Sequence, residues 1–228
     1  MFYYDWTILL MLPGLLLGLW AQYKVKSTFE KYSRVGSRYG YSADRIARAL
    51  LDQNQCHSVT IQQTGGSLTD HYDPRGNVLR LSQSVYGSGS VAAIGVAAHE
   101  CGHAFQKNEG YSPLNLRSLL VPVVNLGSSL YFPIFLLGMV FSWQPLVYAG
   151  IACFAMTLVF ALVTLPVEFN ASHRAIRALR AGGYLSEEEL RGAKNVLDAA
   201  ALTYVASAIS ALLQLMRLLL IARRNDRD

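Results

Sequence analysis

The sequence is poor in charged residues. Only 15% of its 228 residues are Asp, Glu, Lys or Arg, whereas 52% are hydrophobic. Soluble domains typically carry about 25% charged residues. The charges are also clustered, which leaves long uncharged runs and argues against an ordinary soluble domain. The net charge of +5 fits a membrane protein with basic loops, and no aromatic-basic module indicates a nucleic-acid partner.

Cysteine is scarce as well. Cys56, Cys101 and Cys153 are far apart, and no CxxC pair is present. This spacing indicates neither a disulfide framework nor a zinc site made of thiolates. Unpaired cysteines fit a reducing compartment.

Four apolar runs stand out, at 6–21, 119–141, 146–167 and 199–222. The first has no basic residue before it and no A-x-A pattern after it, so it predicts a membrane anchor rather than a cleaved signal peptide. Phe2, Tyr3 and Tyr4 extend this short run, and Trp6 and Trp20 are placed like interfacial aromatic residues.

The other three runs predict a hairpin and a long last helix. The second and third runs carry no charge, and each is long enough to cross a bilayer, which takes about 20 residues. S-W-Q-P joins them, so we expect a tight hairpin. Gln214 and Arg217 interrupt the fourth run, so it either spans the membrane or packs half-buried. The sequence therefore predicts three to four transmembrane helices.

Basic residues predict the orientation. They are frequent in the polar segments 22–118 and 168–198 and absent from the hairpin tip at 142–145. By the positive-inside rule, both polar segments are cytoplasmic and the N-terminus is outside. The basic tail R-R-N-D-R-D conflicts with a fourth full span. The predicted divisions are an anchor (1–21), a cytoplasmic segment (22–118), a hairpin (119–167), a second cytoplasmic segment (168–198) and a C-terminal helix with its tail (199–228).

Short motifs indicate helices and strands within the polar segments. Ser42 is placed to cap a helix over S-A-D-R-I-A-R-A-L-L-D. S-V-T-I-Q-Q and V-L-R-L-S are typical of strands, with turns at T-G-G and D-P-R-G-N. The stretch S-G-S-V-A-A-I-G-V-A-A-H-E-C-G-H-A-F predicts a helix. Ser186 and Glu189 form a capping box that opens the last helix.

A-A-H-E-C-G-H-A-F contains the motif HExxH. On a helix, His99 and His103 lie one turn apart and face the same side, so both imidazoles reach one ion. Glu100 is rotated by about 100 degrees and stands beside the metal without being a ligand. This pattern is typical of two zinc ligands and a general base for a water molecule. The alternative is a pair of partly exposed histidines on an ordinary helix.

A catalytic zinc needs a third protein ligand. The extended motif HExxHxxGxxH fails, because Gln106 stands where Gly would turn the chain and Glu109 stands where His would bind. Glu168 fits better, since it ends an otherwise uncharged run and a carboxylate there is costly unless it is used or paired. A glutamate that faces water at the interface is the alternative. His173 and Glu109 are reserve ligands.

Several polar residues near Glu168 are candidates for supporting roles. Asn170 and Ser172 are placed to hydrogen-bond the ligands. His173 or Arg174 is placed to stabilise an oxyanion, although Arg174 is equally suited to contact a lipid phosphate. Tyr204 is a further candidate oxyanion donor, with a packed tyrosine as the alternative.

The turn D-H-Y-D-P-R also holds potential metal ligands. Asp70, His71 and Asp73 lie close together in it. Asp and Pro more simply make a turn, so these residues are left out of the predicted site.

The chain resembles the YugP-like neutral membrane zinc metallopeptidases and, more distantly, HtpX-like membrane proteases. The resemblance is carried by D-H-Y-D-P-R, A-A-H-E-C-G-H-A-F-Q, V-E-F-N-A-S-H-R-A and L-D-A-A-A-L-T-Y-V-A. It implies one zinc ion bound by His99, His103 and Glu168, with Glu100 as catalytic base, in a bacterial plasma membrane. HtpX-like enzymes have an aspartate four residues after the ligand glutamate, where this chain has Ser172.

These observations predict a mainly α integral membrane protein with a zincin-like catalytic domain, which combines the HExxH helix with a small β element. The predicted function is a zinc-dependent endopeptidase whose active site faces the cytoplasm. Its expected partners are the lipid bilayer and a polypeptide substrate, including membrane proteins. We also expect V-L-R-L-S to bind peptide by strand addition. Two alternatives remain, a zinc hydrolase of a non-peptide amide and a non-catalytic metal-binding membrane scaffold.

Overall fold

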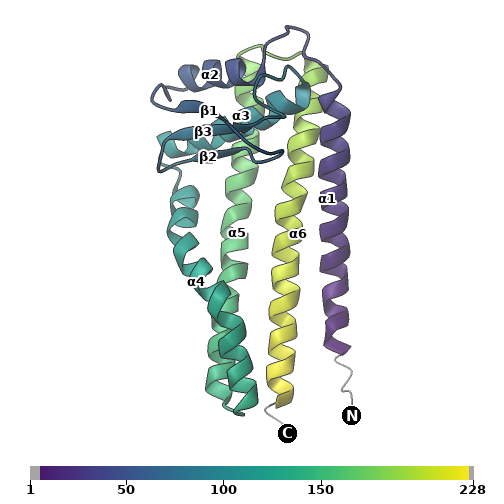
Figure 1. The fold of residues 1–228 in the computed structure, drawn as a ribbon, viewed down its shortest axis with the longest axis vertical. Helices are drawn as coiled ribbons and strands as arrows, with labels where there is room; N and C mark the ends of the chain where they lie inside the picture. The colour runs from purple at the N-terminus through teal and green to yellow at the C-terminus, as the bar shows by residue number, and fades with distance from the viewer. Residues whose placement is uncertain (1–5, 226–228) are drawn as a thin grey trace. The chain divides into compact units, whose positions relative to one another are not determined.

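The structure is a computed structural model that describes residues 6–225. Phe2, Tyr3 and Tyr4, which the sequence suggests as an extension of the first span, lie outside the described residues, as does the end of the R-R-N-D-R-D tail. The elements along the chain, shown in Figure 1, are a short 3-10 helix (Trp6–Met11), α1 (Leu12–Ser33), α2 (Ala43–Gln53), β1 (Thr60–Thr64), β2 (His71–Asp73), β3 (Val78–Ser82), α3 (Val91–Asn108), α4 (Ser112–Val140), α5 (Gln144–Ala181) and α6 (Glu187–Asn225). The predicted mainly α fold with a small β element is confirmed.

Long apolar helices dominate the described part of the chain. Four helical segments in it are long and apolar enough to cross a membrane: Trp6–Ser33, Ser112–Val140, Gln144–Ala181 and Glu187–Arg224. The last of them contains the run that Gln214 and Arg217 interrupt, so by length and composition this helix also qualifies as a span.

The chain forms two compact units. The first comprises residues 115–165 together with the described parts of the N-terminal 21 residues and of the chain after residue 202. The second comprises Gln22–Leu114 and Pro166–Leu202. The helices α1, α5 and α6 each contribute residues to both units.

In the first unit, α4 and α5 form a closely packed hairpin. Only residues 141–143 separate the two helices. A Cβ atom on Gly138 would lie 2.5 Å from the backbone nitrogen of Val147, and one on Gly150 would lie 2.7 Å from that of Phe135. Glycine at these positions lets the two backbones approach closely, which confirms the tight hairpin expected from S-W-Q-P.

The second unit contains a three-stranded sheet among its described residues. The strand order is β1-β3-β2, with β1 parallel and β2 antiparallel to β3. Ile46, Leu50 and Leu51 of α2 are buried in the same core as the apolar face of α3. Figure 1 shows α2, the three strands and α3 gathered together in this unit.

The sheet corrects the expected role of V-L-R-L-S. This segment is β3, the central strand, and both of its edges are already paired, with β1 on one side and β2 on the other. Strand addition to it is therefore excluded. β2 is the edge strand beside α3, and it lies within D-H-Y-D-P-R, which the sequence indicates only as a turn.

Side-chain caps start two of the helices. Ser186 donates its backbone N–H to Glu189 at 2.7 Å, and Glu189 returns a backbone bond to the Ser186 hydroxyl at 3.3 Å, so the predicted capping box is confirmed. Ser90 caps α3 by accepting from the Ala93 N–H. Ser42 occupies the N-cap position of α2, but its side chain makes no cap hydrogen bond.

Asp70 and Asp73 at the two ends of β2 have structural roles. Asp73 accepts the backbone N–H groups of Arg75 and Gly76, which hold the pKa of its carboxyl below the usual value. Asp70 accepts the backbone N–H and the hydroxyl of Ser82. Both carboxylates have local structural partners, which agrees with leaving this motif out of the metal site.

Candidate metal centre

Close contact between α3 and α5 creates the candidate metal centre. Gly102 lies within HExxH, and a Cβ atom there would overlap the backbone carbonyl oxygen of Ala171 on α5. No residue with a side chain fits at this distance unless one helix moves. Because Gly102 has no side chain, α3 can approach α5 closely enough to place His99 and His103 next to Glu168.

His99, His103 and Glu168 form the metal-binding group that the described residues contain. The Glu168 Oε2 atom lies 3.2 Å from His99 Nε2 and 3.6 Å from His103 Nε2. Four-coordinate zinc with bonds of about 2.0–2.1 Å places its ligand atoms about 3.3 Å apart. Both distances from Glu168 are close to this spacing, and all three ligand atoms lie within 4.8 Å of one another, so two imidazoles and one carboxylate here fit zinc.

The charge of the group also suits a cation. Glu168 is only 2% exposed, although it is a carboxylate, and His103 is 8% exposed. Burial opposes a charge on His103, but the carboxylates of Glu168 and Glu100 raise its pKa above the ordinary value. Two carboxylates beside buried imidazoles therefore stabilise a positive charge at the site, and a bound metal ion supplies that charge.

Each histidine has a polar partner on its second ring nitrogen. His99 Nδ1 lies 3.0 Å from the hydroxyl of Ser172, and His103 Nδ1 lies 3.0 Å from Gln106 Oε1. Because an amide oxygen only accepts, His103 carries its proton on Nδ1 in this contact. Its Nε2 atom is then left free to bind a metal.

Gln106 is a part of the site that the sequence prediction omits. It is fully buried, and its Nε2 atom donates to the Val167 carbonyl at 2.8 Å and to Asn170 Oδ1 at 2.9 Å. Its place one turn after His103, on the helix face that carries both histidines, is the signal that could have identified it.

The other predicted supporting residues have different surroundings. Asn170 contacts Gln106 rather than a metal ligand, and it also accepts from Arg174 at 2.6 Å. Arg174 forms an ion pair with Glu109 at 2.5 Å. His173 is exposed and accepts from Arg177. Neither reserve ligand, His173 nor Glu109, belongs to the metal-binding group of the described residues.

Tyr204 lies in α6 within the first compact unit, whereas the metal-binding group lies in the second. Its role as an oxyanion donor therefore stays a prediction.

Glu100 lies beside the ligand group without being part of it. Its side chain is partly buried, and Oε2 accepts the backbone N–H of Tyr72 in β2 at 2.9 Å. The edge strand thus holds one carboxylate oxygen in place. The other carboxylate oxygen, Oε1, forms no hydrogen bond with any described residue.

Comparisons with known proteins identify the family of the chain. The family model described as "Putative neutral zinc metallopeptidase" matches residues 7–223. The protein named "Putative membrane protease YugP" from Bacillus subtilis (strain 168) is 46% identical over 221 residues, which cover 97% of this chain and 98% of that protein. No solved structure matches the chain. Since the family match extends over nearly the whole chain and includes all three candidate ligands, the chain belongs to this neutral zinc metallopeptidase family, and zinc is its cofactor.

Proposed function

We propose that this protein is a membrane-embedded endopeptidase that hydrolyses peptide bonds at the zinc site of His99, His103 and Glu168. The observation that carries the proposal is the group of three ligands with Glu100 next to it. A structural zinc site is closed by four protein ligands, whereas a catalytic one keeps an open position. The three-ligand group favours an enzyme over a metal-binding scaffold.

The residues of the site divide the chemistry between them. Zinc, when bound, supplies a Lewis acid that makes water more acidic and polarises a carbonyl group. Glu100 accepts the proton of the attacking water on its free oxygen and then passes it to the leaving amine. The Tyr72 N–H keeps the other oxygen in place during both steps. Gln106 and Ser172 hold the imidazoles of His103 and His99 in the orientation that binding requires.

The membrane arrangement extends the proposal to the substrate. The name of the Bacillus relative, a membrane protease, and the apolar helices support a protein that is integral to the membrane, here a bacterial plasma membrane. The distribution of basic residues supports an active site that faces the cytoplasm. Membrane proteins and their juxtamembrane segments are then the substrates within reach. We also retain the predicted division of the chain at residues 21, 118, 167 and 198.

The test is peptide cleavage by the full-length, zinc-loaded protein in detergent, compared with Glu100→Gln. A randomised peptide library is incubated with each protein, and the products are identified by mass spectrometry. We expect wild-type cleavage at internal bonds and a loss of about 10²–10⁴-fold in rate for Glu100→Gln, with zinc content unchanged.

Equal cleavage by Glu100→Gln and wild type would contradict the role of Glu100. If neither zinc-loaded protein cleaves any peptide, the endopeptidase proposal fails, and small amides become the substrates to examine.

A further inference from the structure

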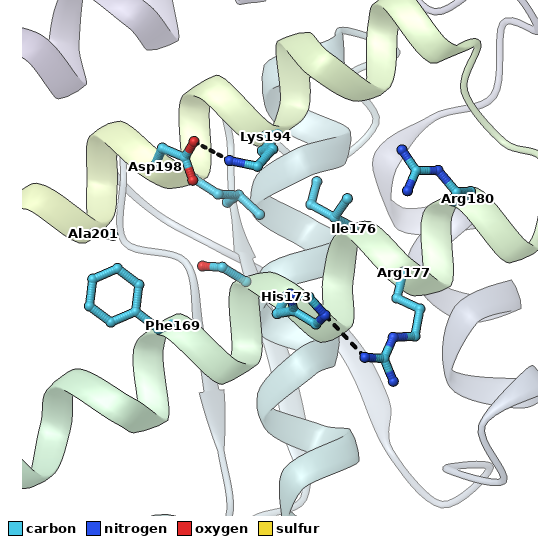
Figure 2. Close-up of a pocket in the computed structure, with 10 residues that line it drawn as sticks. Phe169, His173, Ile176, Arg177, Arg180, Lys194, Asp198 and Ala201 are labelled. Atoms are coloured by element: carbon cyan, nitrogen blue, oxygen red, sulfur yellow. Dashed lines mark hydrogen bonds and ion pairs between the residues drawn. The ribbon is translucent and has the colours of Figure 1, made fainter.

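A pocket of about 490 Å³ lies between α5 and α6 in the second compact unit. This volume is within the range of ligand sites, about 300–1,000 Å³. One wall is a helical face of α5 with residues at 169, 173, 176, 177 and 180, and the other is a face of α6 with residues at 194, 197, 198 and 201. Figure 2 shows the labelled side chains of the two helices, with Lys194 beside Asp198 on α6 and Arg177 beside His173 on α5.

The pocket combines an apolar floor with a cationic rim. Phe169, Ile176 and Leu197 supply the apolar surface. Among the described lining residues, three cations face one carboxylate, that of Asp198. The cations are Arg177, Arg180 and Lys194.

Two of these cations already have carboxylate partners. Lys194 pairs with Asp198 at 2.5 Å, and Arg180 pairs with Glu187 at 3.2 Å. Both pairs are exposed, so each contributes little to stability.

Arg177 differs from the other two cations. In the described part of the chain its guanidinium contacts the ring of His173 at 3.0 Å, and it forms no ion pair with a carboxylate. Since Arg only donates, the His173 nitrogen in this contact carries no proton and the ring is not a counterion. Arg177 also borders a smaller cavity with Glu109, but that carboxylate is paired with Arg174. The charge of Arg177 is therefore available to an incoming anion.

The pocket and the metal centre have one neighbouring residue in common. Ser172 lines the pocket, and its hydroxyl lies 3.0 Å from His99. Arg177 is nine residues further along α5 than the ligand Glu168, a rise of about 13.5 Å. An extended peptide advances about 3.4 Å per residue. A residue about four positions from a peptide bond at the metal can therefore reach Arg177.

We propose that this pocket is a substrate subsite that selects an acidic residue, with Arg177 binding its carboxylate and Phe169, Ile176 and Leu197 covering an apolar neighbour. The inference rests on the proposed peptidase function, because it names the class of polypeptide that this site accepts. Arg177 acts in it as a specificity residue, and the chemistry stays with Glu100 and the metal ligands.

Binding and cleavage are measured separately, so that the acidic subsite and the peptidase function can be refuted independently of each other. For binding, fluorescently labelled peptides are titrated into full-length Glu100→Gln protein in nanodiscs of zwitterionic lipid. Each peptide carries Asp or Glu at one position and is compared with its Asn or Gln counterpart. Arg177→Gln is then added to the Glu100→Gln background. Arg191→Gln is the matched control, because Arg191 is exposed on α6 and does not line the pocket.

We expect the acidic peptide to bind about tenfold more tightly than its amide counterpart at one position, since hydrogen bonds to charged groups contribute this much or more. Arg177→Gln should bring the ratio close to one, whereas Arg191→Gln should keep it. In zinc-loaded protein with Glu100 intact, kcat/KM should show the same ratios, and Arg177→Glu should reverse the preference toward Lys.

Equal binding of acidic and amide peptides at every position would overturn the subsite, whatever the cleavage assay shows. So would a preference that survives in Arg177→Gln. A preference that disappears when the nanodiscs contain anionic lipid would assign the pocket to a lipid headgroup instead. A binding preference without any cleavage would leave the subsite in place and refute the peptidase function alone.

Discussion

Gln106 connects the metal centre to the helix that carries the third ligand. Its amide oxygen contacts His103, and its amide nitrogen donates to Val167 and Asn170, which flank Glu168. Asn170 in turn accepts from Arg174. The orientation of one ligand thus depends on a buried chain of polar side chains, in which every member needs its partners.

Replacing Gln106 with Leu should weaken zinc binding. Leu keeps most of the volume of Gln, but it leaves His103 Nδ1 without its partner and removes one of the two donors to Asn170 Oδ1. Loss of such an outer contact typically costs about 10–100-fold in metal affinity. Competition with a chromophoric chelator measures the affinity, and Gln63→Leu on the exposed face of β1 is the control. An unchanged affinity in Gln106→Leu would mean that His103 is oriented without this contact.

At the scale of single residues, the sequence predicts the metal ligands and the catalytic base better than the residues that orient them. His99, Glu100 and His103 follow from one short motif, and Glu168 from its unusual place at the end of an apolar run. Gln106 is harder to recognise. It stands where the extended motif HExxHxxGxxH requires glycine, so in the sequence it only indicates that this motif is absent. Only the fold shows that its amide faces His103.

At the scale of elements, the meeting of α3 and α5 decides the geometry of the site. Gly102 packs directly against the backbone of Ala171. The two glycines of the α4–α5 hairpin act in the same way in the first unit. Small residues thus set the distances between helices in both units.

Gly102→Ala should force α3 away from α5. The added methyl group meets backbone, which cannot rotate aside, and overpacking of this kind costs about 1–3 kcal/mol. We expect a lower unfolding temperature together with a loss of zinc. Gly65→Ala is the matched control, since no heavy atom lies within 4 Å of the Cβ position there. Equal stability and zinc content in the two variants would show that α5 has room to move.

The sheet shows where local patterns are insufficient. β1, β3 and α3 follow from the periodicity of their residues. β2 is three residues long and contains Asp73, a residue type with little strand propensity, so its pairing with β3 depends on the tertiary contact. The central position of β3 also depends on that pairing, and for this reason strand addition to V-L-R-L-S was not excluded by the sequence.

At the scale of the whole molecule, hydropathy predicts the spans, and the metal motif predicts the zinc site. Each of the four candidate spans contains one of the uncharged or nearly uncharged runs. All three metal ligands belong to the second compact unit, although more than 60 residues separate Glu168 from His103. Sequence patterns predict the spans and the candidate ligands but carry no information about the distance between the ligands.

The proposed orientation can be tested in intact cells with a membrane-impermeant thiol reagent. Trp143→Cys marks the hairpin tip, and Ser67→Cys marks the first polar segment; both positions are exposed. Cys56 and Cys101 are buried, and burial raises the pKa of both thiols, so their background reaction is slow. We expect Trp143→Cys to react in intact cells and Ser67→Cys only after lysis. The opposite pattern would place the active site outside.

The central claim is that His99, His103 and Glu168 bind one zinc ion, and zinc content tests it most directly. The full-length protein is purified in detergent under metal-replete conditions, and its zinc is measured by mass spectrometry beside Glu168→Gln and Glu109→Gln. Glu109 is the matched control, because it is also a glutamate and directly follows α3 but pairs with Arg174. The account predicts one zinc per chain in wild type and Glu109→Gln, and a clear loss in folded Glu168→Gln. Full zinc retention in folded Glu168→Gln would contradict it.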